Sequence, residues 1–186
     1  MLPRAFLQKP VAHRALHDRA ARRPENSRAA IRAAIDAGYA MEIDLQLSSD
    51  GQAMVFHDYD LGRLTEATGA VRQRDGAALA RIVLRDGDEG IPTLAEVLDL
   101  VAGRAPLLIE LKDQDGGMGP DVGALERAVA EALRDYRGDV AVMSFNPHSV
   151  AEMARLLPDC PRGLTTCAFE AKHWPTLNES TRARLR

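Results

Sequence analysis

Residues 41–47 alternate strictly between apolar and polar side chains, and this pattern limits most strongly how the chain can fold. The odd positions hold Met41, Ile43, Leu45 and Leu47, and the even positions hold Glu42, Asp44 and Gln46. A period of two residues indicates a β-strand with two different faces. A strand with one face in water has the same pattern, so the neighbouring stretches must distinguish a solvated face from a functional site.

Two other strand-like stretches carry ionisable residues at or near their ends. Residues 53–58 pass from an apolar run into His57 and Asp58, and residues 106–112 place Glu110 and Lys112 on the face opposite Ile109. Ionisable groups beside buried positions are costly unless they pair with each other or bind a metal. The three stretches together therefore indicate a functional site at the ends of strands.

The rest of the chain alternates between expected strands and expected helices. Strands are expected at 11–14, 41–47, 53–57, 107–112, 140–145 and 162–166, and helices at 27–37, 94–102, 121–136, 147–157 and after Pro175, with one helical turn at 77–82. Asn26 or Ser27 can cap the first long helix, and Gly38 can end it. Thr93 and Glu96 form a capping box for a helix that we expect to end at Gly103. Strands separated by helices predict an α/β protein with a parallel sheet.

The short link between the second and third strands leaves two arrangements open. The turn Ser49-Asp50-Gly51 is too short to hold a helix. A hairpin would place Asp44 directly across from His57. A parallel return through about eight extended residues would bring both residues to the same strand end. We favour the parallel arrangement because the rest of the pattern predicts a parallel sheet.

Length and composition exclude several classes of protein. The 186 residues, with a net charge of −3, are most simply one domain, and no Lys/Arg-rich cluster interleaved with aromatic residues predicts a nucleic-acid partner. No apolar run approaches the ~20 residues that span a bilayer, so we expect no stable membrane insertion. Cys160 and Cys167 have no nearby third or fourth ligand for zinc, which favours free thiols and a cytoplasmic location. The sequence does not predict the oligomeric state.

The expected strand ends bring together a set of side chains suited to phosphodiester chemistry: His13, Arg14, Glu42, Asp44, His57, Glu110 and Lys112. Three carboxylates without cysteine ligands suit Mg²⁺ or Ca²⁺, which prefer oxygen donors. Two histidines suit paired general acid and general base roles near neutral pH. Arg14 and Lys112 supply positive charge for the phosphate of an anionic small-molecule substrate, and the planar guanidinium matches phosphate oxygens.

Six motifs within residues 11–112 resemble those of the glycerophosphodiester phosphodiesterases, in the same order. They are residues 12–14, 24–27, 42–44 with 49–51, 55–58, 91–94 and 109–112, and residues 144–147 resemble the fifth strand of that family. The resemblance implies a (β/α)8 TIM barrel of the PLC-like phosphodiesterase architecture. It also implies hydrolysis of glycerophosphodiesters to glycerol 3-phosphate and an alcohol, with a divalent metal. By position, it makes Glu42, Asp44 and Glu110 the metal ligands, and His13 and His57 the acid and base.

The chain departs from the family pattern in two places. Ala15 follows His13-Arg14 where the family usually has glycine, in a loop that borders the phosphate site. The strand count stops at about six, whereas a closed barrel of this type has eight. We therefore expect residues 1–186 to form one catalytic domain that is incomplete at its C-terminus, without the last two strands that help form the pocket wall in the family.

Other functions remain open from the sequence. A lysophospholipase D-like phosphodiesterase shares this chemistry but needs an apolar surface near the entrance of its pocket. A barrel that binds anionic metabolites without turnover belongs to a different class. A carbon-acid enzyme with Lys112 as its base leaves both histidines and Arg14 without a role.

Several other side chains have expected roles outside the proposed catalytic set. Asp58 is either a partner of His57 or a turn residue, and Glu25 is expected to be structural. Trp174 is expected to pack against other side chains and not to serve as a base-stacking platform. The remaining histidines, which match no motif, are expected on the surface: His17, His148 and His173.

Overall fold

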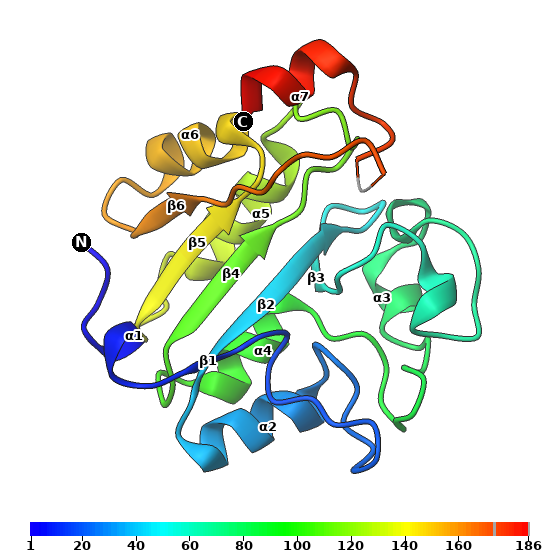
Figure 1. The fold of residues 1–186 in the computed structure, drawn as a ribbon. Helices are drawn as coiled ribbons and strands as arrows, with labels where there is room; N and C mark the ends of the chain where they lie inside the picture. The colour runs from blue at the N-terminus through cyan, green and yellow to red at the C-terminus, as the bar shows by residue number, and fades with distance from the viewer. Residues whose placement is uncertain (173, 186) are drawn as a thin grey trace.

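The computed structural model describes residues 1–172 and 174–185, and a mainly parallel sheet forms its centre (Figure 1). The strands are β1 (Val11–Ala12), β2 (Ala40–Leu47), β3 (Ala53–Val55), β4 (Leu107–Leu111), β5 (Val140–Ser144) and β6 (Arg162–Leu164). Strands β1, β2, β4, β5 and β6 lie in that order and run parallel, while β3 pairs only with β2. The predicted α/β class with a parallel sheet is confirmed.

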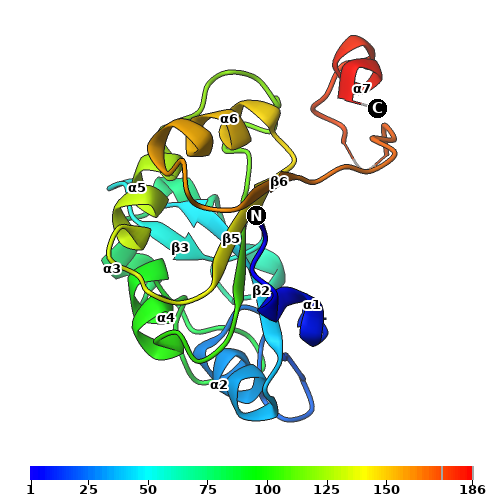
Figure 2. The same cartoon turned by 90° about the vertical axis from the view of Figure 1, so that its left-hand side faces the viewer.

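Four helices cover one face of the sheet, and the N-terminal segment lies on the other face (Figure 2). The four are α2 (Arg28–Ala37), α4 (Leu94–Val101), α5 (Ala124–Leu133) and α6 (Pro147–Leu156). Shorter helical elements are α1 (Ala5–Gln8), η1 (Leu61–Arg63), η2 (Val71–Gln73), α3 (Gly76–Leu79) and α7 (Glu179–Leu185). Within residues 1–172 and 174–185, no helix has both the length and the apolarity that crossing a bilayer requires.

The alternation along β2 separates the hydrophobic core from the inner face of the sheet. Met41, Ile43 and Leu45 are fully buried in the cluster that the sheet forms with the covering helices. Strand β4 lies beside β2 in a register that pairs Asp44 with Glu110. Because side chains alternate along each strand, both carboxylates point to the inner face at the same level.

The helix ends follow the predicted capping chemistry, with two refinements. The Ser27 hydroxyl accepts from the Ala30 N–H at 3.1 Å, so Ser27 caps α2 and leaves Asn26 free for another role. Helix α2 ends at Gly38 as predicted, with φ 68°, and the capping box at the start of α4 is present. Helix α4 ends one residue earlier than expected, because Ala102 itself adopts the left-handed conformation at φ 46°.

The parallel arrangement that we favoured for the third strand is wrong, because β2 and β3 form an antiparallel hairpin. The Ser48 N–H donates to the Gln52 carbonyl at 3.0 Å, and this link is too short for a parallel crossover. The hairpin register also differs by one residue from the alternative that we considered. Phe56, rather than His57, lies opposite Asp44, and its N–H donates to the Asp44 carbonyl at 2.9 Å.

Residues 59–90 form an excursion between β3 and α4. Although the sequence of 61–88 is rich in polar residues, glycine and arginine, several residues of the excursion build a second, small hydrophobic core with Met54, Phe56 and Ile91. The buried residues of this second core are Met54, Phe56, Leu61, Val71, Leu79, Leu84 and Ile91. Their irregular spacing gives no helical or strand period, so the sequence pattern did not reveal them. This packing anchors the excursion next to the carboxyl end of β2.

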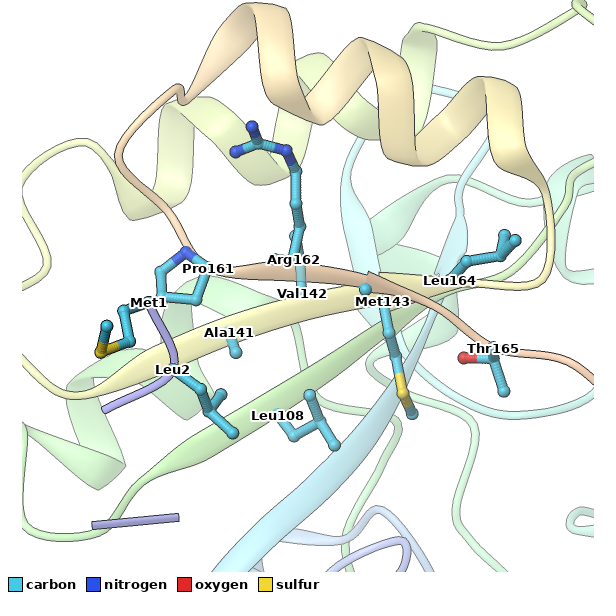
Figure 3. A pocket seen from close by; sticks show the side chains of 11 residues that line it. Met1, Leu2, Leu108, Ala141, Val142, Met143, Pro161, Arg162, Leu164 and Thr165 are labelled. Carbon is cyan, nitrogen blue, oxygen red and sulfur yellow. The ribbon is translucent and has the colours of Figure 1, made fainter. Parts of the chain in front are cut away.

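The end of the inner face that lies away from the carboxylates is apolar. Phe6 of α1 packs there against Ala40 and Ala141. Beside it, a groove runs along β4, β5 and β6, with Met1 and Leu2 at one end (Figure 3). The polar inner-face residues are therefore concentrated toward the opposite end.

Glycine at position 90 is required by a close backbone approach. A Cβ added to Gly90 would lie 1.8 Å from the Ala80 carbonyl oxygen, so the backbone would have to move. We expect Gly90→Ala to lower the free energy of unfolding by about 1–3 kcal/mol, the usual cost of overpacking. Urea denaturation measures this loss. Gly163→Ala is the matched control, since a Cβ there meets nothing within 4 Å, and an equal loss in both variants would contradict the steric explanation.

Candidate active site

Three buried carboxylates face one another on the inner face of β2 and β4. Glu42, Asp44 and Glu110 are 3%, 0% and 7% exposed. One oxygen from each lies within 4.8 Å of the others, and this is the group with metal-binding potential found among the described residues. Like charges this close are unfavourable in a buried site unless cations or hydrogen-bond donors offset them.

The neighbouring strand end and loop supply those partners. Lys112 Nζ lies 2.7 Å from Asp44 Oδ1 and 2.6 Å from Glu110 Oε1. The Asn26 side-chain amide donates to Asp44 Oδ2 at 2.9 Å. Asn26 is therefore a site residue, whereas the sequence indicated only a possible helix cap within the motif of residues 24–27. Its backbone is left-handed, with φ 59°, so no strand or helix periodicity could have indicated this role.

Glu42 is less fully compensated than the other two carboxylates. Its Oε2 accepts from the Arg14 backbone N–H at 2.9 Å, whereas its buried Oε1 has no hydrogen-bond partner among the described residues. Burial, and then the charges of Asp44 and Glu110, raise the pKa of Glu42 to about 7. A buried oxygen without a donor, within a set of three carboxylates, fits a hard divalent cation such as Mg²⁺ or Ca²⁺.

A tight turn after β1 presents His13 and Arg14 to the carboxylates. The first strand ends at Ala12, two residues earlier than expected, because Arg14 and Ala15 have φ values of 56° and 61°. The Ala15 N–H donates to the Glu42 carbonyl at 2.9 Å, which ties the turn to β2. Glycine would adopt this conformation without strain, whereas alanine adopts it at a cost.

His13 and Arg14 differ in their surroundings. Arg14 Nη1 donates to Glu25 Oε1 at 2.8 Å, and its Nε lies 3.8 Å from Asp44 Oδ2. His13 is exposed. Partial burial, and then the Arg14 charge, lower the pKa of His13, although the Asp44 charge opposes them. His13 therefore loses its proton more readily than an ordinary histidine.

His57 follows the hairpin and is held by the next residue in the chain. Its Nδ1 lies 2.6 Å from Asp58 Oδ1, so Asp58 is a partner of the imidazole ring. Asp58 also accepts from Arg63 Nε at 2.5 Å and from Arg63 Nη2 at 2.9 Å. Burial disfavours the Asp58 charge, but the hydrogen bonds from His57 and Arg63 outweigh it and hold the pKa of Asp58 well below its usual range.

A cavity of about 560 Å³ opens beside His57, Glu110 and Lys112. Its far wall is apolar and is formed by Met118, Phe145 and Trp174. The Trp174 ring packs against Phe145 and Phe169 with centroids 5.3 Å from each, as expected of a packing residue, although Trp174 is only partly buried. The cavity therefore joins a charged centre to an aromatic surface.

The structure gathers five of the seven predicted site residues into one network of contacts, and the two histidines border it. The five are Arg14, Glu42, Asp44, Glu110 and Lys112. His17 and His148 are exposed and take no part in the network, and His173 lies outside the described residues. Arg63 is a neighbour that the sequence analysis missed, because it lies in the excursion without a motif.

Comparison with known proteins is consistent with this geometry. Glycerophosphodiester phosphodiesterases of Caldanaerobacter subterraneus subsp. tengcongensis and Bacillus altitudinis are 29% and 30% identical to the chain, over 76% and 83% of its length. The chain spans 60% and 65% of those two relatives.

Comparison with solved structures gives the same result. An Oleispira antarctica phosphodiesterase, solved in complex with the product sn-glycerol-3-phosphate, matches 97% of this chain and 74% of its own at a TM-score of 0.75 and 26% identity. This likeness confirms a barrel-type α/β fold, of which the chain contributes part. The family model for the glycerophosphoryl diester phosphodiesterase family matches residues 13–183. Since this match covers most of the sequence, the chain belongs to the glycerophosphoryl diester phosphodiesterase family.

Proposed function

We propose that the protein hydrolyses glycerophosphodiesters to glycerol 3-phosphate and an alcohol, and that the reaction depends on a divalent metal. The observation that carries this proposal is the buried group of Glu42, Asp44 and Glu110, whose oxygens lie within 4.8 Å of one another beside cationic side chains. Family membership supports the substrate class, and the product bound to the Oleispira relative is glycerol 3-phosphate.

The three carboxylates would hold the metal ion, and Mg²⁺ and Ca²⁺ both suit an all-oxygen donor set. When bound, such an ion polarises a phosphoryl oxygen and offsets charge that develops in the transition state. Arg14 and Lys112 bind the remaining phosphate oxygens. Glu25 orients the Arg14 guanidinium through the hydrogen bond to Nη1.

The two histidines transfer the protons. His13 has a lowered pKa and so is neutral at neutral pH, which suits the general base that takes a proton from the attacking water. His57 donates a proton to the departing alcohol oxygen. The Asp58 carboxylate fixes the ring through Nδ1 and stabilises its positively charged form, which leaves Nε2 for the transfer.

A lysophospholipase D-like activity is the second candidate, and the apolar wall of Met118, Phe145 and Trp174 favours it. An acyl chain needs such a surface close to the reacting phosphate, and this wall lines the same cavity as His57. A panel of diesters separates the two candidates: glycerophosphodiesters with small polar alcohols, and lysophospholipids with an acyl chain. Release of glycerol 3-phosphate from the first group supports the main proposal. No turnover of either group, despite binding, supports a metabolite-binding barrel.

The partners and the compartment follow from the same reasoning. We propose a small-molecule substrate as the partner, and the absence of a nucleic-acid partner stays a prediction from composition. Cys160 and Cys167 are both free thiols. This state is typical of a reducing compartment, so we retain the cytoplasm as the proposed location.

Metal binding should depend on pH because a proton competes for Glu42. With the pKa of Glu42 raised to about 7, a cation must displace this proton at lower pH. We expect metal affinity to fall roughly 10-fold per pH unit below that value. Titration calorimetry at about pH 6 and about pH 8 measures the change. Glu42→Gln should abolish metal binding at both values, and full activity after exhaustive chelation would contradict the metal site.

Loss of either histidine should slow turnover without unfolding the chain. We expect His13→Ala and His57→Ala each to lower kcat by about 10²–10⁴-fold, the usual contribution of a positioned proton transfer. Each variant should also lose one limb of the pH–rate profile. His148→Ala is the control, because His148 is exposed and lies outside the site. Nearly full activity in His57→Ala would refute the role given to it.

The acidic limb of the profile should respond to the charge at position 14. Burial and the Arg14 charge lower the pKa of His13, so removing that charge should raise the pKa again. We expect Arg14→Gln to move the acidic limb of kcat/KM to higher pH. The move should be smaller than the whole lowering of the His13 pKa, because partial burial still lowers that pKa. Arg14→Lys keeps the charge and should leave the limb in place while weakening phosphate binding. Measurements at saturating metal test this, and an unmoved limb in Arg14→Gln would exclude His13 as its source.

A further inference from the structure

Arg63 lies between two carboxylates and binds each of them with two hydrogen bonds. Toward Asp58, its Nε donates to Oδ2 at 2.5 Å and its Nη2 to Oδ1 at 2.9 Å. Toward Glu25, its Nη1 donates to Oε2 at 3.0 Å and its Nη2 to Oε1 at 2.7 Å. Such paired hydrogen bonds use the rigid planar fork of arginine and fix direction as well as distance.

Each of these carboxylates also holds a group of the proposed active site. Asp58 lies against His57 Nδ1 at 2.6 Å, and Glu25 accepts from Arg14 Nη1 at 2.8 Å. A continuous series of side-chain contacts therefore connects Arg14 to His57. It passes through Glu25, Arg63 and Asp58. The two ends of this series of contacts come from different parts of the sequence: Arg14 lies in the turn after β1, and His57 is the second residue after β3.

Arg63 itself is held by the excursion and not by the barrel. It is the last residue of η1, which begins where the Asp60 side chain accepts from the Gly62 N–H at 2.8 Å. Its carbonyl accepts from Arg85 Nη1 at 2.9 Å, and Leu61, the first residue of η1, is buried in the second hydrophobic core. The excursion thus presents the guanidinium from a fixed backbone, although the side chain remains 47% exposed.

Charge explains why both carboxylates depend on this arginine. The side chains of Asp58 and Glu25 are only 22% and 12% exposed, so an unpartnered negative charge on either would be costly. Burial disfavours the Glu25 charge, but the hydrogen bonds from Arg63 and Arg14 outweigh it and lower the pKa of Glu25. Without Arg63, each carboxylate would keep one partner and lose the contact that fixes its plane.

We propose that Arg63 is a positioning residue that sets the orientation of His57 and of Arg14 together, through Asp58 and Glu25. The proton-transfer group and the phosphate-binding group would then adopt their working geometry as one unit. The proposal rests on the proposed function for its kinetic consequences, but the coupling itself is a property of the side chains. It gives the excursion of residues 59–90 a role in the site that none of the sequence motifs covers.

Kinetics of position 63 variants test the proposal. We expect Arg63→Ala to lower kcat by about 10- to 100-fold and to raise KM, because misplaced outer partners cost roughly that much. Arg63→Lys keeps the charge without the fork and should recover little of the loss. Arg19→Ala is the matched control. It removes an exposed arginine that binds Asp86 at 2.7 Å at the edge of the same excursion, and we expect a change of less than about 2-fold.

Nitrogen-15 NMR of the His57 ring gives a readout that does not need catalysis. In the wild-type chain we expect the proton on Nδ1, against Asp58, and in Arg63→Ala a mixture of the two tautomers. Arg19→Ala should keep the wild-type spectrum. A wild-type chain without hydrolase activity whose tautomer still changes in Arg63→Ala would overturn the proposed function and support the coupling.

A double-mutant cycle tests whether Arg63 acts through Asp58. If it does, Arg63→Ala combined with Asp58→Asn should cost little more in kcat than Asp58→Asn alone. Additive losses would overturn the proposal, as would wild-type kcat and tautomer in Arg63→Ala. Should Arg63→Ala fail to fold, as judged by thermal melting, the same comparisons apply to Arg63→Lys. Wild-type kcat and a wild-type His57 tautomer in Arg63→Lys would show that the planar guanidinium is not needed, and would overturn the proposal.

Discussion

The site depends on the register that places Asp44 beside Glu110 on the inner face of the sheet. This pairing, with Glu42 two residues earlier on the same face, concentrates three carboxylates in a region that the fold removes from water. The surrounding partners are arranged to meet that cost. Lys112 bridges Asp44 and Glu110, and the Asn26 amide donates to the second oxygen of Asp44. The Arg14 backbone N–H, in the turn after β1, donates to Glu42. A one-residue slip of β4 would point Glu110 into the helix layer and remove the site.

The negative charges of the three carboxylates are offset unequally by their neighbours, and the least compensated carboxylate is the one that best fits a cation. Asp44 contacts both Lys112 and Asn26, whereas Glu42 keeps a buried oxygen without a donor among the described residues. A raised pKa is the physical result, because the proton substitutes for the missing positive charge. The apolar residues on the opposite face of β2 stabilise the fold by packing in the hydrophobic core. The inner face can therefore hold groups that do not contribute to stability.

Much of the fold and site could be predicted from the sequence because their determinants are local or periodic. The alternation along residues 41–47, the capping box at Thr93 and the left-handed end at Gly38 each follow from short-range chemistry. The direction of β3 could have been decided by the same means, since residues 48–52 are too few for a parallel crossover. The expectation of a wholly parallel sheet led us to the wrong direction. The core of residues 59–90 and the contacts of Asn26 and Arg63 were also beyond the pattern, because they depend on residues that meet only after folding.

The antiparallel direction of β3 is what allows the excursion to take part in the site. A hairpin returns the chain along β2, so β3 ends at Val55 opposite Leu45, Phe56 lies opposite Asp44, and His57 follows directly. The next residues then leave the sheet at this level and pack on their own core, instead of covering the sheet as a helix would. That exit places η1 where Arg63 can reach Asp58 and Glu25 at the same time. A departure from the regular strand–helix repeat of the barrel thus brings Arg63 into contact with Asp58 and Glu25, the partners of His57 and Arg14.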